Sequence, residues 1–141
     1  MSALEFDNVT VTYANRVAVN GFSDRVAPGE WVGVIGPNGA GKSSLLRAVA
    51  GLVASSGSIR VDGVSLAAMT DRERARRVAY VAQNPLIPDD MTAFDYVLLG
   101  RTPYVGYFAS ESATDRAATA DVIDRLRLGP FARRLMGSMS G

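Results

Sequence analysis

The sequence predicts an α/β fold, and three features support that prediction. Apolar residues alternate with polar ones from Leu4 to Tyr13, as they do in a half-buried β-strand. The apolar run Trp31–Ile35 is suited to a strand buried on both faces of a sheet. Residues 42–50 and much of the chain after residue 90 carry the apolar spacing and capping residues of helices. Strands that lead into helices in this order are typical of α/β proteins.

The next elements are a second strand and a helix. A strand is predicted over Val17–Phe22, after a turn at Asn15 and Arg16. The helix over residues 42–50 is expected to end at Gly51, which stands where a C-terminal cap belongs.

Three shorter elements follow. A strand is predicted over Ser58–Val61, with Asp62–Gly63 as its turn. Thr70–Glu73 forms a capping box that opens a charged helix toward Arg77. The apolar segment Val78–Ala82 is a second candidate for a buried strand.

The chain after residue 83 is expected to be mainly helical. A loop over residues 84–90 precedes a helix from Thr92 to about Gly100, and residues 101–110 are predicted to be irregular. Ser112–Asp115 caps a longer helix, with Gly129 past its end. One face of that helix is predicted to carry Ala118, Val122 and Leu126.

Composition excludes several classes of function. The 141 residues are 48% hydrophobic and 21% charged with net charge +1, which is typical of a soluble globular protein. The absence of cysteine and histidine excludes disulfides, thiolate metal sites and histidine catalysis within these residues. No transmembrane stretch or signal peptide is recognised, so we expect the chain to stay in the cytosol. Nucleic acid is not expected as a partner, because the arginines over residues 72–77 alternate with acids and lack interleaved aromatics.

Residues 36–43 match the phosphate-binding pattern G-x-x-x-x-G-K-[ST] in full, between an apolar run and a predicted helix. Glycines let the backbone fold tightly around a phosphate, and the helix beginning at Lys42 adds the positive end of its dipole. The Lys42 ammonium can reach the β- and γ-phosphates, and the Ser43 hydroxyl is placed to ligate Mg²⁺. We therefore predict a nucleotide-binding segment, named the phosphate loop, that consists of Gly36, Pro37, Asn38, Gly39, Ala40, Gly41, Lys42, Ser43 and Ser44.

The phosphate loop and three further features, in matching order, resemble the ATP-binding domain of ABC transporters. Tyr13 is similar to the aromatic residue that stacks on adenine in that family, a role that needs a flat π face. Gln83 resembles the family glutamine whose amide approaches Mg²⁺ and the γ-phosphate. Met139–Gly141 resembles the start of the signature motif, so Ser140 and Gly141 would contact nucleotide on an opposite subunit. The resemblance thus implies ATP and Mg²⁺ as cofactors, Lys42 and Gln83 as catalytic residues, and Ser43 and Gln83 as Mg²⁺ ligands.

The resemblance covers essentially the whole chain but only part of the family's domain. It implies a P-loop NTPase fold with an N-terminal antiparallel β arm, part of a parallel core sheet and a helical subdomain. Residues 1–83 would form the β arm and the phosphate-loop core, and residues 84–141 the glutamine loop and the helical subdomain. The family's Walker B aspartate, catalytic glutamate and switch histidine have no counterpart in this sequence. We therefore expect missing C-terminal core strands, uncovered apolar surface and no ATP hydrolysis by the 141 residues alone.

The segment Met91–Tyr104 resembles the corresponding segment of importers for iron–siderophore, haem and cobalamin. This implies the ATP-binding subunit of such an importer, peripheral on the cytoplasmic face of the membrane. The implied partners are a second ATPase subunit, transmembrane permease subunits and, indirectly, a periplasmic or lipoprotein substrate-binding protein.

Other interpretations remain open at this point. The chain could serve another ABC system, or it could be a fragment that binds nucleotide without catalysis. A GTPase or a small-molecule kinase would use the same phosphate loop. The guanine-recognition pattern Asn-Lys-x-Asp is absent from the sequence, and a strong preference for GTP over ATP would reverse our interpretation.

Overall fold

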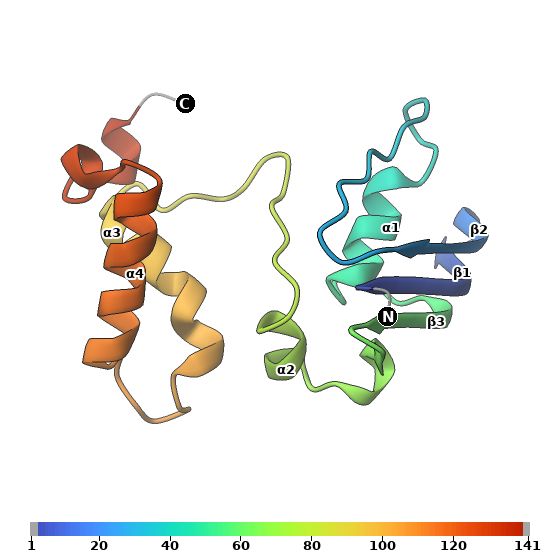
Figure 1. Cartoon of the computed structure of the whole chain (residues 1–141). Coiled ribbons are helices and arrows are strands. Elements are labelled where there is room, and N and C mark those ends of the chain that lie inside the picture. The colour runs from blue at the N-terminus through green and yellow to red at the C-terminus, as the bar shows by residue number, and fades with distance from the viewer. Residues whose placement is uncertain (1–2, 140–141) are drawn as a thin grey trace. The chain divides into compact units, whose positions relative to one another are not determined.

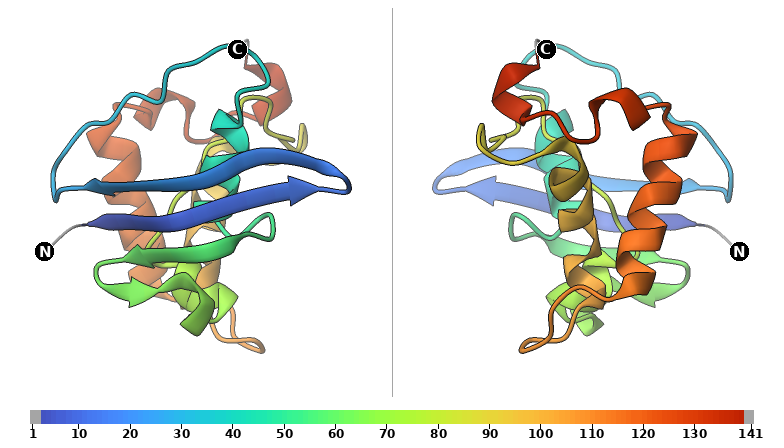
Figure 2. Two further views of the ribbon diagram at one scale, coloured as in Figure 1. Left: turned by 90° about the vertical axis from the view of Figure 1, so that its right-hand side faces the viewer. Right: turned by 90° about the vertical axis from the view of Figure 1, so that its left-hand side faces the viewer.

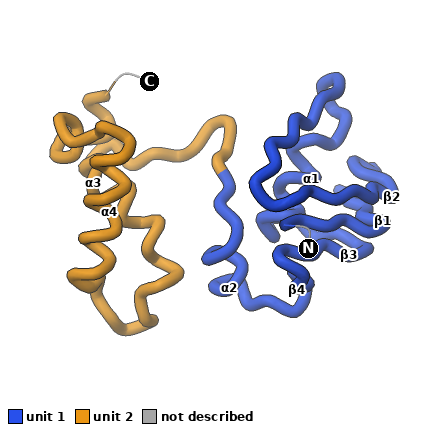
Figure 3. Tube along the Cα trace, viewed as in Figure 1, with its two compact units in different colours: residues 1–80 blue, residues 81–141 orange. Residues whose placement is uncertain are grey.

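The structure is a computed structural model that describes residues 3–139, and the chain divides into two compact units. The first unit ends at Tyr80 and the second begins at Val81, as the two colours of Figure 3 show. Figure 1 labels the main helices and strands along the chain.

An antiparallel sheet of four strands, in the order β2-β1-β3-β4, forms the base of the first unit. The strands are β1 (Leu4–Tyr13), β2 (Arg16–Val26), β3 (Ser56–Val61) and β4 (Val64–Ser65). Strand β1 lies between β2 and β3, so Leu4 faces Val26 on one side and Val61 on the other. Asp62 and Gly63, with φ of 50° and 78°, connect β3 to β4 as predicted. The predicted antiparallel arm is confirmed.

Helix α1 (Lys42–Val49) packs on one face of this sheet, as both views in Figure 2 show. Its apolar side meets the inward side of β1 and β3, because alternate residues of a strand point to the same face. The buried core consists of Phe6, Val9, Val11, Leu45, Ala48, Val49, Ile59, Val61, Leu66 and Met69. Gly51 has φ of +71° and its N–H donates to the Ala48 carbonyl, which confirms the predicted cap.

The two segments expected to supply buried core strands do not form strands. Trp31–Ile35 and Val78–Ala82 pair with no strand among the described residues, and Trp31 and Ile35 are 100% and 95% exposed. A strand buried on both faces needs hydrogen-bonded neighbouring strands and a packed layer on each face. The described sheet provides these two segments with no neighbouring strand and no covering layer. Residues 3–139 thus form no parallel part of the sheet, whereas the predicted uncovered apolar surface is confirmed.

A 3₁₀ turn, η1 (Leu66–Ala68), and helix α2 (Asp71–Ala75) complete the first unit. The capping box is present, since the Glu73 N–H donates to the Thr70 hydroxyl and the Thr70 N–H donates to the Glu73 carboxylate. Helix α2 ends at Ala75, slightly before the predicted end at Arg77.

The second unit is helical, as predicted. Its elements are α3 (Ala93–Leu98), η2 (Leu99–Tyr104), α4 (Ala113–Arg125), η3 (Gly129–Phe131) and η4 (Met136–Ser138). The 3₁₀ helix η2 falls partly within residues predicted to be irregular. A capping box at Ser112 and Asp115 opens α4, as the sequence indicated.

The buried face of α4 differs from the predicted one. Asp115, Thr119 and Ile123 are buried, whereas Val122 and Leu126 are exposed. Helix α4 ends at Arg125 with its C-cap at Leu126, so Gly129 lies past the helix end as predicted, and the left-handed residue after the cap is Arg127, whose φ is +56°. The Leu128 N–H then donates to the Ile123 carbonyl and closes the helix end before Gly129.

Candidate functional site

The phosphate loop is an exposed turn that ends in helix α1. Gly41 precedes the helix with φ of 87° and ψ of 0°, a left-handed conformation that favours glycine. A Cβ atom at Gly41 would overlap the Ala18 carbonyl oxygen and lie 3.0 Å from Val19 Cγ2, both on β2. Backbone conformation and close contact therefore both require glycine where the loop meets the sheet.

The Lys42 side chain lies over the loop that precedes it. Its ammonium donates to the carbonyl oxygens of Gly36 at 2.6 Å and Pro37 at 2.8 Å, and the Ala40 N–H donates to the same Pro37 oxygen at 3.2 Å. An ammonium carries three N–H donors, and these two bonds use two of them. Lys42 thus holds a positive charge directly over the glycine-rich turn.

Ser43 and Ser44 occupy the first turn of α1. Ser43 is exposed and Ser44 is partly exposed. The N–H groups of a first helical turn lack intrahelical acceptors and, with the helix dipole, favour an anion there. The loop, the ammonium and the helix end therefore form a site suited to a phosphate chain.

The β1–β2 hairpin reaches the phosphate loop from the sheet. Tyr13 pairs with Arg16 where the two strands meet. Arg16 Nη2 lies 3.5 Å from the position that a Cβ atom of Gly39 would occupy. The end of β1, with its 39% exposed Tyr13, thus lies in the same unit as the loop, and its hairpin partner Arg16 lies near Gly39.

Sequence reasoning missed Arg47, in the last turn of α1. The Tyr80 side chain and, to a smaller extent, the Tyr13 side chain raise the pKa of Arg47 above its usual value. An arginine near the end of a helix has an ordinary explanation in the helix dipole, so the sequence carried no signal of this interaction.

Gln83 lies in the second unit, whereas the phosphate loop lies in the first. It is exposed, at a bend that follows the extended segment 78–82. The shared Mg²⁺ site of Ser43 and Gln83 therefore stays a prediction.

Ser140 and Gly141 lie outside the described residues, so their predicted contact with an opposite nucleotide also stays a prediction. The segment leading to them is held in place within the second unit. The Met136 N–H donates to the Met91 carbonyl at 2.8 Å, and the Gly137 N–H donates to the Asp89 carbonyl at 3.1 Å.

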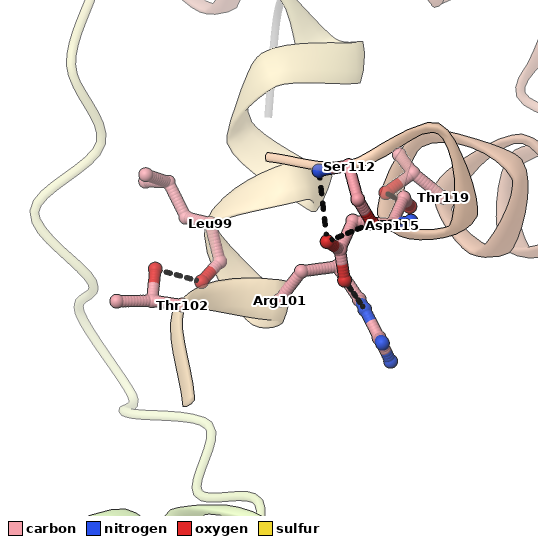
Figure 4. A network of polar contacts seen from close by, with 6 residues as sticks. All are labelled: Leu99, Arg101, Thr102, Ser112, Asp115 and Thr119. Atoms are coloured by element: carbon pink, nitrogen blue, oxygen red, sulfur yellow. Dashed lines mark hydrogen bonds and ion pairs between the residues drawn. The ribbon is translucent and has the colours of Figure 1, made fainter. Parts of the chain in front are cut away.

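A polar network in the second unit anchors the segment that carried the importer resemblance (Figure 4). Arg101 Nε donates to Asp115 Oδ1 at 2.9 Å, and the Arg101 guanidinium lies 3.9 Å from the Tyr104 ring centroid. The Ser112 N–H and hydroxyl both donate to Asp115 Oδ2, and these bonds, followed by the one from Arg101, lower the pKa of Asp115. The network ties η2 to the start of α4 and lies in the unit that does not hold the phosphate loop.

The described residues contain no group of three or more acidic, histidine or cysteine side chains that could hold a metal ion. Oxygen donors for Mg²⁺ at the phosphate loop would thus come from single side chains such as Ser43 and from a bound nucleotide. Within residues 3–139, no helix has the length and apolar character needed to cross a membrane.

Comparison with known proteins gives concordant matches. A family model described as "ABC transporter" matches residues 19–141. The manganese transport system ATP-binding protein MntB of Listeria monocytogenes is 31% identical over 141 residues, which cover 98% of this chain and 57% of MntB. The zinc transport system ATP-binding protein TroB of Treponema pallidum is 34% identical, over 99% of this chain and 52% of TroB. This chain therefore spans about half the length of the curated relatives that it matches.

A solved structure supports the same relationship. A transporter described as being of metal-chelate type, in an inward-facing conformation, aligns with a TM-score of 0.76 and 26% identity, over 99% of this chain and 50% of that one.

Proposed function

Because this chain belongs to the ABC transporter family, we propose that it binds ATP at the phosphate loop and forms part of a transporter's ATP-binding subunit. The observation that carries the proposal is the complete loop itself. The Lys42 ammonium donates hydrogen bonds to the carbonyls of Gly36 and Pro37. Gly41 packs closely against β2, and the loop ends at the start of α1.

The residues fit a magnesium–triphosphate ligand. Lys42 offers a flexible ammonium that can move from carbonyl acceptors to the more strongly charged β- and γ-phosphate oxygens. The first N–H groups of α1 would bind further oxygens, and the exposed Ser43 hydroxyl would ligate the ion. Bound Mg²⁺ would neutralise charge on the phosphates. Tyr13 offers its ring to the base, and Gln83 is assigned to the same ion by its place in the sequence.

We assign ATP hydrolysis to a subunit of the relatives' full length. Lys42 and Gln83 would act on the γ-phosphate, while the general base and the aspartate that supports Mg²⁺ would come from outside residues 1–141. The 141 residues alone are expected to bind nucleotide without turning it over.

The proposed setting is the cytoplasmic face of a membrane. Two ATP-binding subunits would pair, with Ser140 and Gly141 of one facing nucleotide on the other, and would drive permease subunits that receive cargo from an external binding protein. The relatives named for manganese and zinc transport, and the metal-chelate type transporter, favour import of a metal ion or metal chelate. Iron–siderophore, haem and cobalamin are the chelates that the segment Met91–Tyr104 favours.

The natural gene product, reconstituted in vesicles with its permease and binding protein, tests this function. We expect ATP hydrolysis that rises when metal-loaded binding protein is supplied, and that Lys42→Met abolishes. Hydrolysis that is unaffected by Lys42→Met would contradict the assignment of the site. Hydrolysis that responds only to a cargo without metal would contradict the cargo class.

A further inference from the structure

The start of strand β2 runs beside the phosphate loop. A Cβ atom at Gly41 would overlap the carbonyl oxygen of Ala18, and a Cβ atom at Gly39 would lie 3.5 Å from Nη2 of Arg16. Arg16 and Ala18 are two residues apart on the strand, as Gly39 and Gly41 are in the loop. The strand and the loop therefore approach each other at two successive points, and an arginine side chain lies at one of them.

The Arg16 guanidinium is free to bind an anion at this place. Arg16 is exposed, at the end of the hairpin where it pairs with Tyr13. Within residues 3–139, no ion pair or hydrogen bond holds its guanidinium. A guanidinium has five N–H donors and stays charged at any pH at which the protein is folded. Gly39 has no side chain, so these donors lie beside the backbone of the loop itself.

Arg16 and Lys42 lie at different parts of the phosphate loop. The Lys42 ammonium donates to the carbonyls of Gly36 and Pro37, at the beginning of the loop. Arg16 lies beside Gly39, the fourth residue of the loop. An ammonium acts on a phosphate as a point charge, whereas the planar guanidinium can donate two parallel hydrogen bonds to phosphate oxygens. A phosphate chain that extends along the loop would therefore meet two cations in succession.

We propose that Arg16 is a second cation of the nucleotide site, which donates to phosphate oxygens of the bound nucleotide from the side of β2. This inference rests on the proposed function, because it requires a nucleotide at the phosphate loop. The phosphate-loop pattern does not contain this residue, since Arg16 precedes Gly36 by twenty positions in the sequence. A contact with the phosphates alone should strengthen binding of any polyphosphate, with or without a base.

The test compares ATP with tripolyphosphate, which has the phosphates but no base, in calorimetric titrations of the natural gene product with Mg²⁺. We expect Arg16→Gln to weaken both ligands about three- to tenfold, the lower end for charge-assisted hydrogen bonds because Arg16 is exposed. Arg25→Gln is the matched control, since Arg25 is an exposed arginine near the other end of β2, up to about 30 Å away along the strand. Its loss removes the same charge and should change either affinity by less than about twofold.

A second variant covers the case in which Arg16→Gln fails to fold. Arg16→Lys keeps the positive charge and the ability to donate to phosphate but loses the planar fork. It should therefore bind both ligands more tightly than Arg16→Gln and more weakly than the wild type, with the same proportional loss for each. A loss for ATP alone in this variant would contradict a contact with the phosphates.

Each outcome decides the question. A loss for ATP without a loss for tripolyphosphate would show that Arg16 acts on the base or the ribose, which would overturn the proposal. Equal losses in Arg16→Gln and Arg25→Gln would reveal a general effect of charge and would overturn it too. Unchanged affinities in Arg16→Gln would also overturn it, while the proposed function would stand. Wild-type protein that binds neither ligand would refute the proposed function and this inference with it.

Discussion

Replacement of Gly41 by alanine tests the architecture of the phosphate loop most sharply. A left-handed backbone costs a residue with a Cβ atom about 1–2 kcal/mol. The new methyl would also overlap the Ala18 carbonyl, and a backbone atom of the paired strand β2 cannot rotate away as a flexible side chain can. Overpacking of this kind costs a further 1–3 kcal/mol or so. We therefore expect Gly41→Ala to lower the free energy of unfolding by about 2–5 kcal/mol and to abolish ATP binding.

Gly63→Ala is the matched control. Gly63 also has a positive φ, of 78°, but a Cβ atom there would meet nothing within 4 Å. This change carries the backbone cost alone, about 1–2 kcal/mol, and should leave ATP affinity unchanged. Urea denaturation and ATP titration of both variants supply the comparison. Equal losses of stability in the two variants, with ATP binding kept at Gly41→Ala, would refute our account of how the loop meets β2.

Three further predictions concern single side chains. Ser43→Ala should remove most of the gain in ATP affinity that Mg²⁺ produces, while the affinity for magnesium-free ATP should stay within about twofold of the wild-type value. Titrations of ATP with and without Mg²⁺ measure both effects. An unchanged dependence on Mg²⁺ would rule out Ser43 as a ligand of the ion. Val9→Ala should lower the free energy of unfolding by about 2–3 kcal/mol, because Val9 is 0% exposed. Val17→Ala, at a residue that is 54% exposed, should lower it by less than about 0.5 kcal/mol in the same urea denaturation assay. The lowered pKa of Asp115 means that its contribution to stability is complete above the unfolded-state pKa near 3.8 and is lost as pH falls through the lower folded-state pKa. Asp115→Asn should therefore weaken the protein at neutral pH and flatten its acid-unfolding profile, and a profile identical to that of the wild type would contradict the Ser112 and Arg101 contacts.

Local signals in the sequence predicted local structure well. The capping boxes at Thr70 and Ser112, the turn at Asp62–Gly63 and the cap at Gly51 all depend on residues within a few positions of one another. The phosphate loop belongs to the same class, because its glycines, its lysine and the start of α1 are consecutive in the chain.

Features that depend on distant partners were predicted less well. The apolar run Trp31–Ile35 has the composition of a buried strand, but burial requires neighbouring strands that residues 3–139 do not supply to it. The face of α4 was misplaced because Asp115 and Thr119 are polar. Arg101, Ser112 and the Asp115 carbonyl satisfy their polar atoms and let them be buried. Only the folded chain reveals such compensation.

The central claim is that residues 36–44 bind ATP, and one titration tests it most directly. ATP and GTP are titrated into the natural gene product and into its Lys42→Met variant. We predict one ATP per chain, weaker binding of GTP, and a loss of about 10- to 100-fold in the variant, the range for charge-assisted hydrogen bonds. ATP binding that does not depend on Lys42, or a strong preference for GTP, would contradict the account.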